Sequence, residues 1–73
     1  MKEKDEILLK KIGRQVLQIR IEKGLSQEDV AFRCEVDRGK ISKIENGSAN
    51  YQITTLVDLA HGLAVDVRKF FEF

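Results

Sequence analysis

The sequence contains no proline and no tryptophan, only one cysteine, and no long hydrophobic run. The single cysteine, Cys34, cannot form a disulfide within the chain, and no spacing of cysteine and histidine matches a zinc site. The first apolar run, residues 7–9, lies between charged residues and is too short for a signal-peptide core or a membrane span. We therefore expect a cytoplasmic protein with no metal, no cofactor and no membrane partner.

Charged residues are plentiful, and their signs nearly balance. Lysine and arginine number 13, aspartate and glutamate number 12, and the net charge is +1 at pH 7. This balance excludes an acidic disordered tail and a uniformly basic protein that coats DNA. We predict a single domain over residues 1–73, because a chain of this length has room for one small core. Such a core is marginally stable alone, so well-packed helices and a partner subunit are the expected means of stabilisation.

Apolar residues that recur every three or four positions predict an all-α fold, and no segment alternates with the period of a half-buried strand. Five helices are expected, at about residues 5–23, 27–34, 38–45, 53–63 and 67–71. Ser26, Asp37 and Asp66 are the expected N-caps of the second, third and fifth helices. Asp29, three residues after Ser26, predicts a variant of the capping box. The third helix should end at Gly47.

The second and third helices and their short connection predict a helix-turn-helix over about residues 26–46, whose second helix would lie in the DNA major groove. If Ile41 and Ile44 face inward, the outward residues of this helix are the candidates for reading bases. They are Arg38, Gly39, Lys40, Ser42 and Lys43. The planar fork of an arginine can donate two hydrogen bonds to one guanine. A solvated face would also account for three cations on a short helix, so spacing alone does not establish DNA binding.

The run from Ile19 to Gly47, IRIEKGLSQEDVAFRCEVDRGKISKIENG, resembles the lambda-repressor/Cro-like helix-turn-helix family, also called XRE-type. The resemblance continues through residues 55–60 to Val65-Asp66. Asp37-Arg38 and the ending Phe70-Phe71-Glu72 are also similar to the stand-alone controllers of restriction-modification systems. The resemblance implies a compact lambda-repressor-like domain that regulates transcription. Such a domain would bind double-stranded DNA sequence-specifically, as a homodimer on a palindromic operator.

Further roles are implied by the same resemblance. Residues at the family's phosphate-contacting positions are Gln27, Asn46, Ser48 and Asn50. Arg20 and Glu45 match a family ion pair that ties the first helix to the end of the third, a structural role. The family usually has glycine where this chain has Glu35 and Ala64. If either backbone is left-handed, a non-glycine residue costs roughly 1 kcal/mol there.

The dimer interface is expected near the carboxyl end of the chain. Val67, Phe70 and Phe71 share one face of the last helix, and Phe73 follows them. We predict that one phenylalanine fills the core and that Phe71 or Phe73 contacts the second subunit. These side chains could instead all close the open end of a small core.

No catalytic residue is indicated, because no nucleophile is paired with a base. His61 is expected on the surface, and Cys34 is expected as a buried apolar thiol on the second helix. Regulation would come from blocking RNA polymerase or from touching it at an adjacent site. The alternative is an antitoxin that binds both DNA and a toxin protein, a role disfavoured by the lack of an arm to wrap a partner. A protein-interaction module that has lost DNA binding is a more distant alternative, disfavoured by the outward cations.

Overall fold

The computed structural model describes residues 2–73 and contains no strand within them. Its elements are α1 (Glu3–Glu22), α2 (Gln27–Arg33), α3 (Arg38–Asn46), α4 (Ile53–Leu63) and the 3-10 helix η1 (Val67–Phe71). The all-α prediction is confirmed, but the count of five α-helices is wrong because the last element is a 3-10 helix. So short a segment completes few i→i+4 bonds and favours the tighter i→i+3 pattern. None of the helices in residues 2–73 combines the length and hydropathy needed to cross a bilayer.

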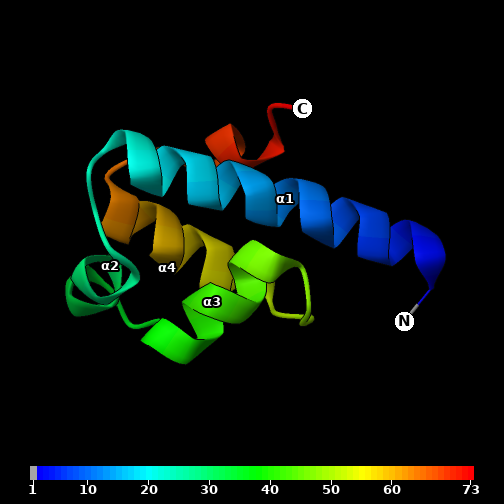
Figure 1. The fold of residues 1–73 in the computed structure, drawn as a ribbon, viewed down its shortest axis with the longest axis horizontal. Helices are drawn as coiled ribbons and strands as arrows, with labels where there is room; N and C mark the ends of the chain where they lie inside the picture. The colour runs from blue at the N-terminus through cyan, green and yellow to red at the C-terminus, as the bar shows by residue number, and fades with distance from the viewer. Residues whose placement is uncertain (1) are drawn as a thin grey trace.

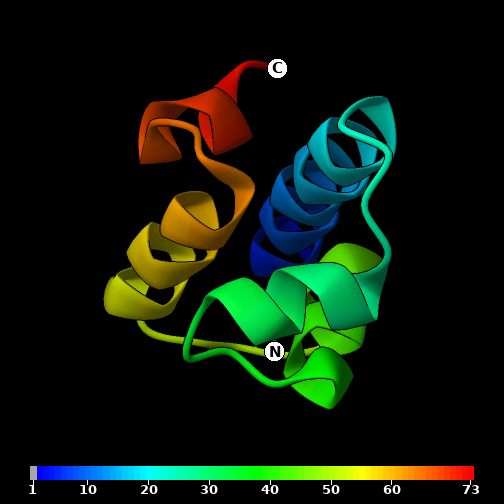
Figure 2. The same ribbon diagram turned by 90° about the vertical axis from the view of Figure 1, so that its left-hand side faces the viewer.

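Helix α1 is the longest element of residues 2–73, and α3 and η1 pack against it (Figure 1). Figure 2 shows α2 and α3 beneath α1, with α4 and η1 beside it. Helix α1 contacts α3 and η1, while α2 contacts α3 and α4. The helix-turn-helix is therefore held between α1 and α4 and keeps its outer surface open to solvent.

The core is made of aliphatic side chains and one aromatic ring. Its members without exposed surface are Val16, Val30, Ile41, Ile44, Leu59 and Phe70. Burial of each such side chain contributes about 1.5–3 kcal/mol. Ile41 and Ile44 fix the inward face of α3, which confirms the orientation predicted for that helix.

The burial of Phe70 corrects the predicted dimer interface. Helix η1 turns this ring into the core, where it has no exposed surface and no area left for a second subunit. Val67 is half-buried against the same core. Phe71 and Phe73 stay exposed, at 43% and 59% of their full surface. One phenylalanine does fill the core, and it is Phe70.

Two glycines allow α1 to lie directly against the end of α3. A Cβ atom on Gly13 would collide with the carbonyl oxygen of Ile44. Gly47 ends α3 in the left-handed conformation, with φ 67°, and its amide donates to the Ile44 carbonyl at 3.0 Å. A Cβ on Gly47 would lie 2.8 Å from the Cα atom of Lys10. The two helices therefore meet backbone to backbone.

The predicted caps of α2 and α3 are present. The Ser26 hydroxyl accepts from the Asp29 amide at 3.0 Å, and the Ser26 amide donates to the Asp29 carboxylate at 2.8 Å. Asp37 accepts from the Lys40 amide at 2.9 Å. The prediction that Cys34 belongs to the second helix is wrong. Helix α2 ends at Arg33, and the backbone of Cys34 is extended. The caps fix where both helices of the helix-turn-helix begin.

The two positions where this chain has another residue in place of the family's usual glycine differ in backbone conformation. Ala64 ends α4 with φ 58° and ψ 41° and is the one non-glycine residue of the described chain with a positive φ. Glu35 does not have a positive φ. Its amide donates to the Asp58 carboxylate at 2.8 Å, which ties the turn after α2 to α4. Strain from a missing glycine is therefore confined to Ala64.

Candidate nucleic-acid interface

The outer face of α3 begins at the Asp37 cap and is oriented by the two buried isoleucines of this helix. Arg38, Gly39 and Lys43 are exposed and Ser42 is half-buried. Together with Gln27, the first residue of α2, these four residues line one hollow in the surface. The structure thus brings four of the five predicted base-reading residues together beside one predicted phosphate contact.

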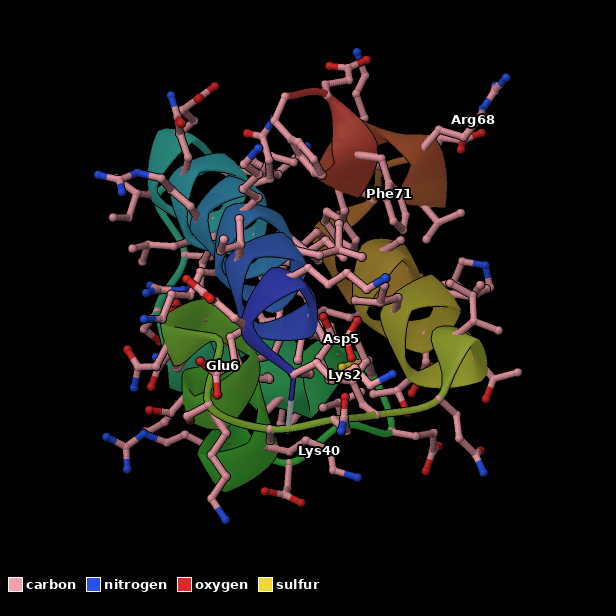
Figure 3. The ribbon with its side chains drawn as sticks, turned by 90° about the vertical axis from the view of Figure 1, so that its right-hand side faces the viewer. Lys2, Asp5, Glu6, Lys40, Arg68 and Phe71 are labelled. Atoms are coloured by element: carbon pink, nitrogen blue, oxygen red, sulfur yellow. The ribbon has the colours of Figure 1, made fainter. Side chains whose placement is uncertain are left out.

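Lys40 lies apart from that hollow. It lines a second one with Asp58 and Thr54 of α4 and Glu35 of the turn. In Figure 3, Lys40 is at the bottom of the molecule, at the opposite end from Arg68. Its position suits a contact at the edge of the interface better than one at its centre.

Arg38 has one acidic neighbour on α2. Its Nε atom lies 3.8 Å from Oε1 of Glu28, and the two side chains are 65% and 78% exposed. A pair so open to solvent is strongly screened and adds little stability. The guanidinium can therefore leave Glu28 for another hydrogen-bond acceptor at small cost.

Glu45 connects all three helices of the site. Arg20 of α1 donates to both of its carboxylate oxygens, at 2.7 and 3.0 Å, and also to the Leu25 carbonyl at 2.8 Å. The Gln27 side chain donates to Oε1 of Glu45 at 2.9 Å. The hydrogen bond to Glu45 raises the pKa of Arg20 above its ordinary value, so the guanidinium stays charged. The network fixes α3 relative to α1 and to the first turn of α2.

The remaining predicted phosphate contacts lie at the last residue of α3 and in the loop after it. Asn46, Ser48 and Asn50 are exposed. The Ser48 amide donates to the Lys43 carbonyl at 3.0 Å, and its hydroxyl donates to the same oxygen at 3.3 Å. The start of the loop is therefore held against the last turn of α3, with Asn46 beside it.

Two cations that the sequence analysis did not single out lie next to Asn46. Lys10 and Arg14 of α1 line a hollow with Leu17, Glu45 and Asn46. Their spacing of four residues placed them on one face of α1, but only the packing of α1 on α3 brings that face to the interface.

Of the three exposed phenylalanines, Phe71 and Phe73 lie at η1 and beyond it, and Phe32 lies on α2. Figure 3 shows the Phe71 side chain below η1, on the side facing α4. The Lys11 ammonium lies 5.5 Å from the centre of the Phe73 ring. On α4, Ile53 and Val57 are also exposed. Apolar surface therefore remains open on α4, η1 and the segment after it.

The other residues considered for chemistry have ordinary surroundings. Burial raises the pKa of the Cys34 thiol, which donates to the Val30 carbonyl at 3.3 Å; the thiolate is thereby disfavoured. His61 is exposed, as predicted. In residues 2–73, no group of three or more histidine, cysteine or acidic side chains is arranged to hold a metal ion.

Known proteins share this sequence pattern and this fold. Residues 16–70 match the family model described as helix-turn-helix. Control protein C.BamHI of Bacillus amyloliquefaciens is 36% identical over 62 residues, which are 84% of this chain and 76% of that protein. The structure of the restriction-modification controller C.AhdI of Aeromonas hydrophila is 33% identical, covers 90% of this chain and 96% of its own, and superposes with a TM-score of 0.85. The controller C.Esp1396I, solved as a tetramer with its natural 35-base-pair operator, is 43% identical over 89% of this chain and 86% of its own, with a TM-score of 0.81.

Proposed function

The chain belongs to the helix-turn-helix family of DNA-binding transcriptional regulators, and on that premise we propose that it is a restriction-modification controller. It binds a palindromic operator in double-stranded DNA as a homodimer. The observation that carries this proposal is the hollow where Arg38, Gly39, Ser42 and Lys43 meet Gln27 on the outside of the helix-turn-helix. The likeness to a controller solved on its operator supports the same reading.

Base reading falls to the first turns of α3. Arg38 donates two hydrogen bonds to a guanine, while Ser42 and Lys43 reach neighbouring bases. Gly39 exposes backbone without a side chain and so allows the groove edge to approach closely. Lys40, which is separated from this hollow, serves best at the flanking edge of the site.

Phosphate contacts set the register in which α3 meets the bases. Gln27 stands at the start of α2, where free backbone amides favour an anion. Asn46, Ser48 and Asn50 contact the backbone at the other end of α3. The Gln27 side chain also donates a hydrogen bond to Glu45 of α3. A phosphate bound at Gln27 would therefore be held in a fixed position relative to α3.

Dimerisation uses the exposed apolar surface at the carboxyl end of the chain. Phe71 and Phe73, with the edge of Val67, contact the second subunit, and Phe70 supports them from the core. A two-fold axis through this surface presents two copies of α3 to the two halves of a palindrome.

The protein acts by binding and not by catalysis, in the cytoplasm, where it controls access of RNA polymerase to its promoter or contacts the polymerase from an adjacent site. Two of the relatives, C.BamHI and C.MunI, are control proteins, which favours this function over the antitoxin alternative. No toxin partner is proposed.

Selection of bound duplexes from random DNA tests the proposal. We expect enrichment of one palindromic sequence whose half-sites lie about one or two helical turns apart. The selected duplex should bind at least about 1000-fold more tightly than random DNA. Enrichment of no sequence, or equal affinity for all duplexes, would contradict the proposal.

A further inference from the structure

The hollow between α1 and the end of α3 has an unbalanced positive charge. Lys10 and Arg14 are both exposed there, beside Asn46. Within residues 2–73, neither cation lies within ion-pairing distance of a carboxylate; the four ion pairs involve other residues. Both side chains are therefore available to an anion from outside the chain.

The positions of these two cations relative to α3 are fixed by close helix packing. Gly13 lies between them in sequence and puts the backbone of α1 against the carbonyls of Ile44 and Glu45. Gly47, which ends α3, lies against the backbone of Lys10 itself. Figure 1 shows the last turn of α3 meeting α1 at this crossing. Any movement of α3 on DNA therefore carries Lys10 and Arg14 with it.

The acidic residue in the same hollow does not neutralise them. Both oxygens of Glu45 accept hydrogen bonds from Arg20, and one also accepts from Gln27. Its side chain is only 4% exposed, so its charge is matched inside the protein. The exposed polar groups of the hollow are therefore two cations and the side chain of Asn46.

We propose that Lys10 and Arg14 form a further phosphate-binding site, which holds the DNA backbone beside the segment read by α3. This inference rests on the proposed function. The site continues the interface past Asn46 onto α1 and lies on the same side of α3 as that predicted phosphate contact. The chain as a whole is nearly neutral, but residues 1–25 hold seven lysines and arginines against four acidic residues. A phosphate-binding site on α1 would account for this excess of positive charge.

The experiment compares Lys10→Gln/Arg14→Gln with the wild type on the selected operator and on random duplex, between about 50 and about 200 mM salt. Each phosphate contact contributes about 0.9 to the slope of log affinity against log salt. We expect the double variant to lose about 1.8 of slope per protomer, and each single variant about half of that. The ratio of operator to random affinity should stay the same, because backbone contacts carry no sequence information.

Lys23→Gln is the matched control. It removes one positive charge from the residue that directly follows α1, in the hollow shared with η1, and should leave the slope unchanged. Thermal unfolding followed by circular dichroism identifies the variants that keep the native fold, and the single variants serve if the double variant does not fold.

A wild-type slope in the folded variants would overturn the proposal. So would a loss of thermal stability with the slope retained, which would mean that the cations only stabilise the carboxyl end of α3 through its dipole. Absence of DNA binding by the wild type would overturn the proposed function as well. The wild-type titration therefore separates the two failures.

Discussion

At the scale of single residues, Ala64 is the one position within residues 2–73 where a non-glycine residue has a positive φ. It ends α4 in the left-handed region, where alanine costs roughly 1 kcal/mol more than glycine. We expect Ala64→Gly to raise the free energy of unfolding by about 0.5–1 kcal/mol, measured by urea denaturation. Glu35→Gly is the matched control and should lower it, because Glu35 has no positive φ to relieve. The same change of stability in both variants would contradict this explanation.

The stability that the Ser26–Asp29 capping box gives to the fold should depend on pH. The pKa of Asp29 is lowered below its ordinary value, mainly by the hydrogen bond from the Ser26 amide and to a smaller extent by hydrogen bonding with the Ser26 side chain. The capping box therefore stabilises the fold above the ordinary aspartate pKa, near 3.9, and loses this contribution as the pH falls through the lowered pKa. We expect Asp29→Asn to be less stable than the wild type at neutral pH and to lose less stability on acidification. Unfolding curves between about pH 6 and pH 2 measure this, and parallel curves would rule it out.

Some assignments at this scale follow from the sequence, and others do not. The outward position of Arg38 and Lys43 follows from local periodicity, because the two apolar residues of α3 determine which way that helix faces. The separation of Lys40 from them depends on where α4 packs, and periodicity carries no information about that. Lys10 and Arg14 reach the interface only because α1 crosses the end of α3, a contact between residues distant in the sequence.

At the scale of elements, the Arg20–Glu45 pair determines how α3 is held. Removing one partner leaves a largely buried charge and should cost about 3–5 kcal/mol. We expect Arg20→Met to be strongly destabilised and Arg20→Met/Glu45→Met to recover much of the loss, since replacing both charges leaves none unpaired. Urea denaturation of the wild type, Arg20→Met, Glu45→Met and the double variant gives the coupling energy of the pair. Additive losses would show that the pair does not act as a unit.

The elements themselves were largely predictable, since caps and apolar spacing are local signals. The beginnings of α2 and α3 follow from Ser26 and Asp37. The last element shows the limit of such signals, because the i, i+3 spacing of Val67 and Phe70 fits both an α-helix and a 3-10 helix. Which of the three phenylalanines near the carboxyl end enters the core depends on how η1 packs against α1 and α4.

At the scale of the whole molecule, substitutions of the adjacent Phe70 and Phe71 should have different effects, the first on folding stability and the second on dimerisation. Phe71→Ser should weaken the dimer and leave the monomer folded, because Phe71 is exposed. Phe70→Ala should cost about 3–5 kcal/mol of folding stability, because it empties part of the core. Sedimentation with circular dichroism measures both properties. A wild type that stays monomeric at high micromolar concentration would contradict the proposed interface.

The near-zero net charge also acts at this scale. A protein with little excess positive charge binds random DNA weakly, so its selectivity must come from placed contacts. The contacts that we propose are the face of α3, the loop after it and the cations of α1. Discrimination by the whole molecule therefore reduces to how α3 meets the bases.

The most direct measurement is a comparison of wild type and Arg38→Ala on the selected operator and on the same duplex with the contacted guanine replaced. We predict that Arg38→Ala loses about 1–3 kcal/mol of binding free energy on the operator. On the replaced duplex the two proteins should bind almost equally, since the contact is already absent there. Equal losses on both duplexes would show that Arg38 contacts only phosphate and would contradict base reading by α3.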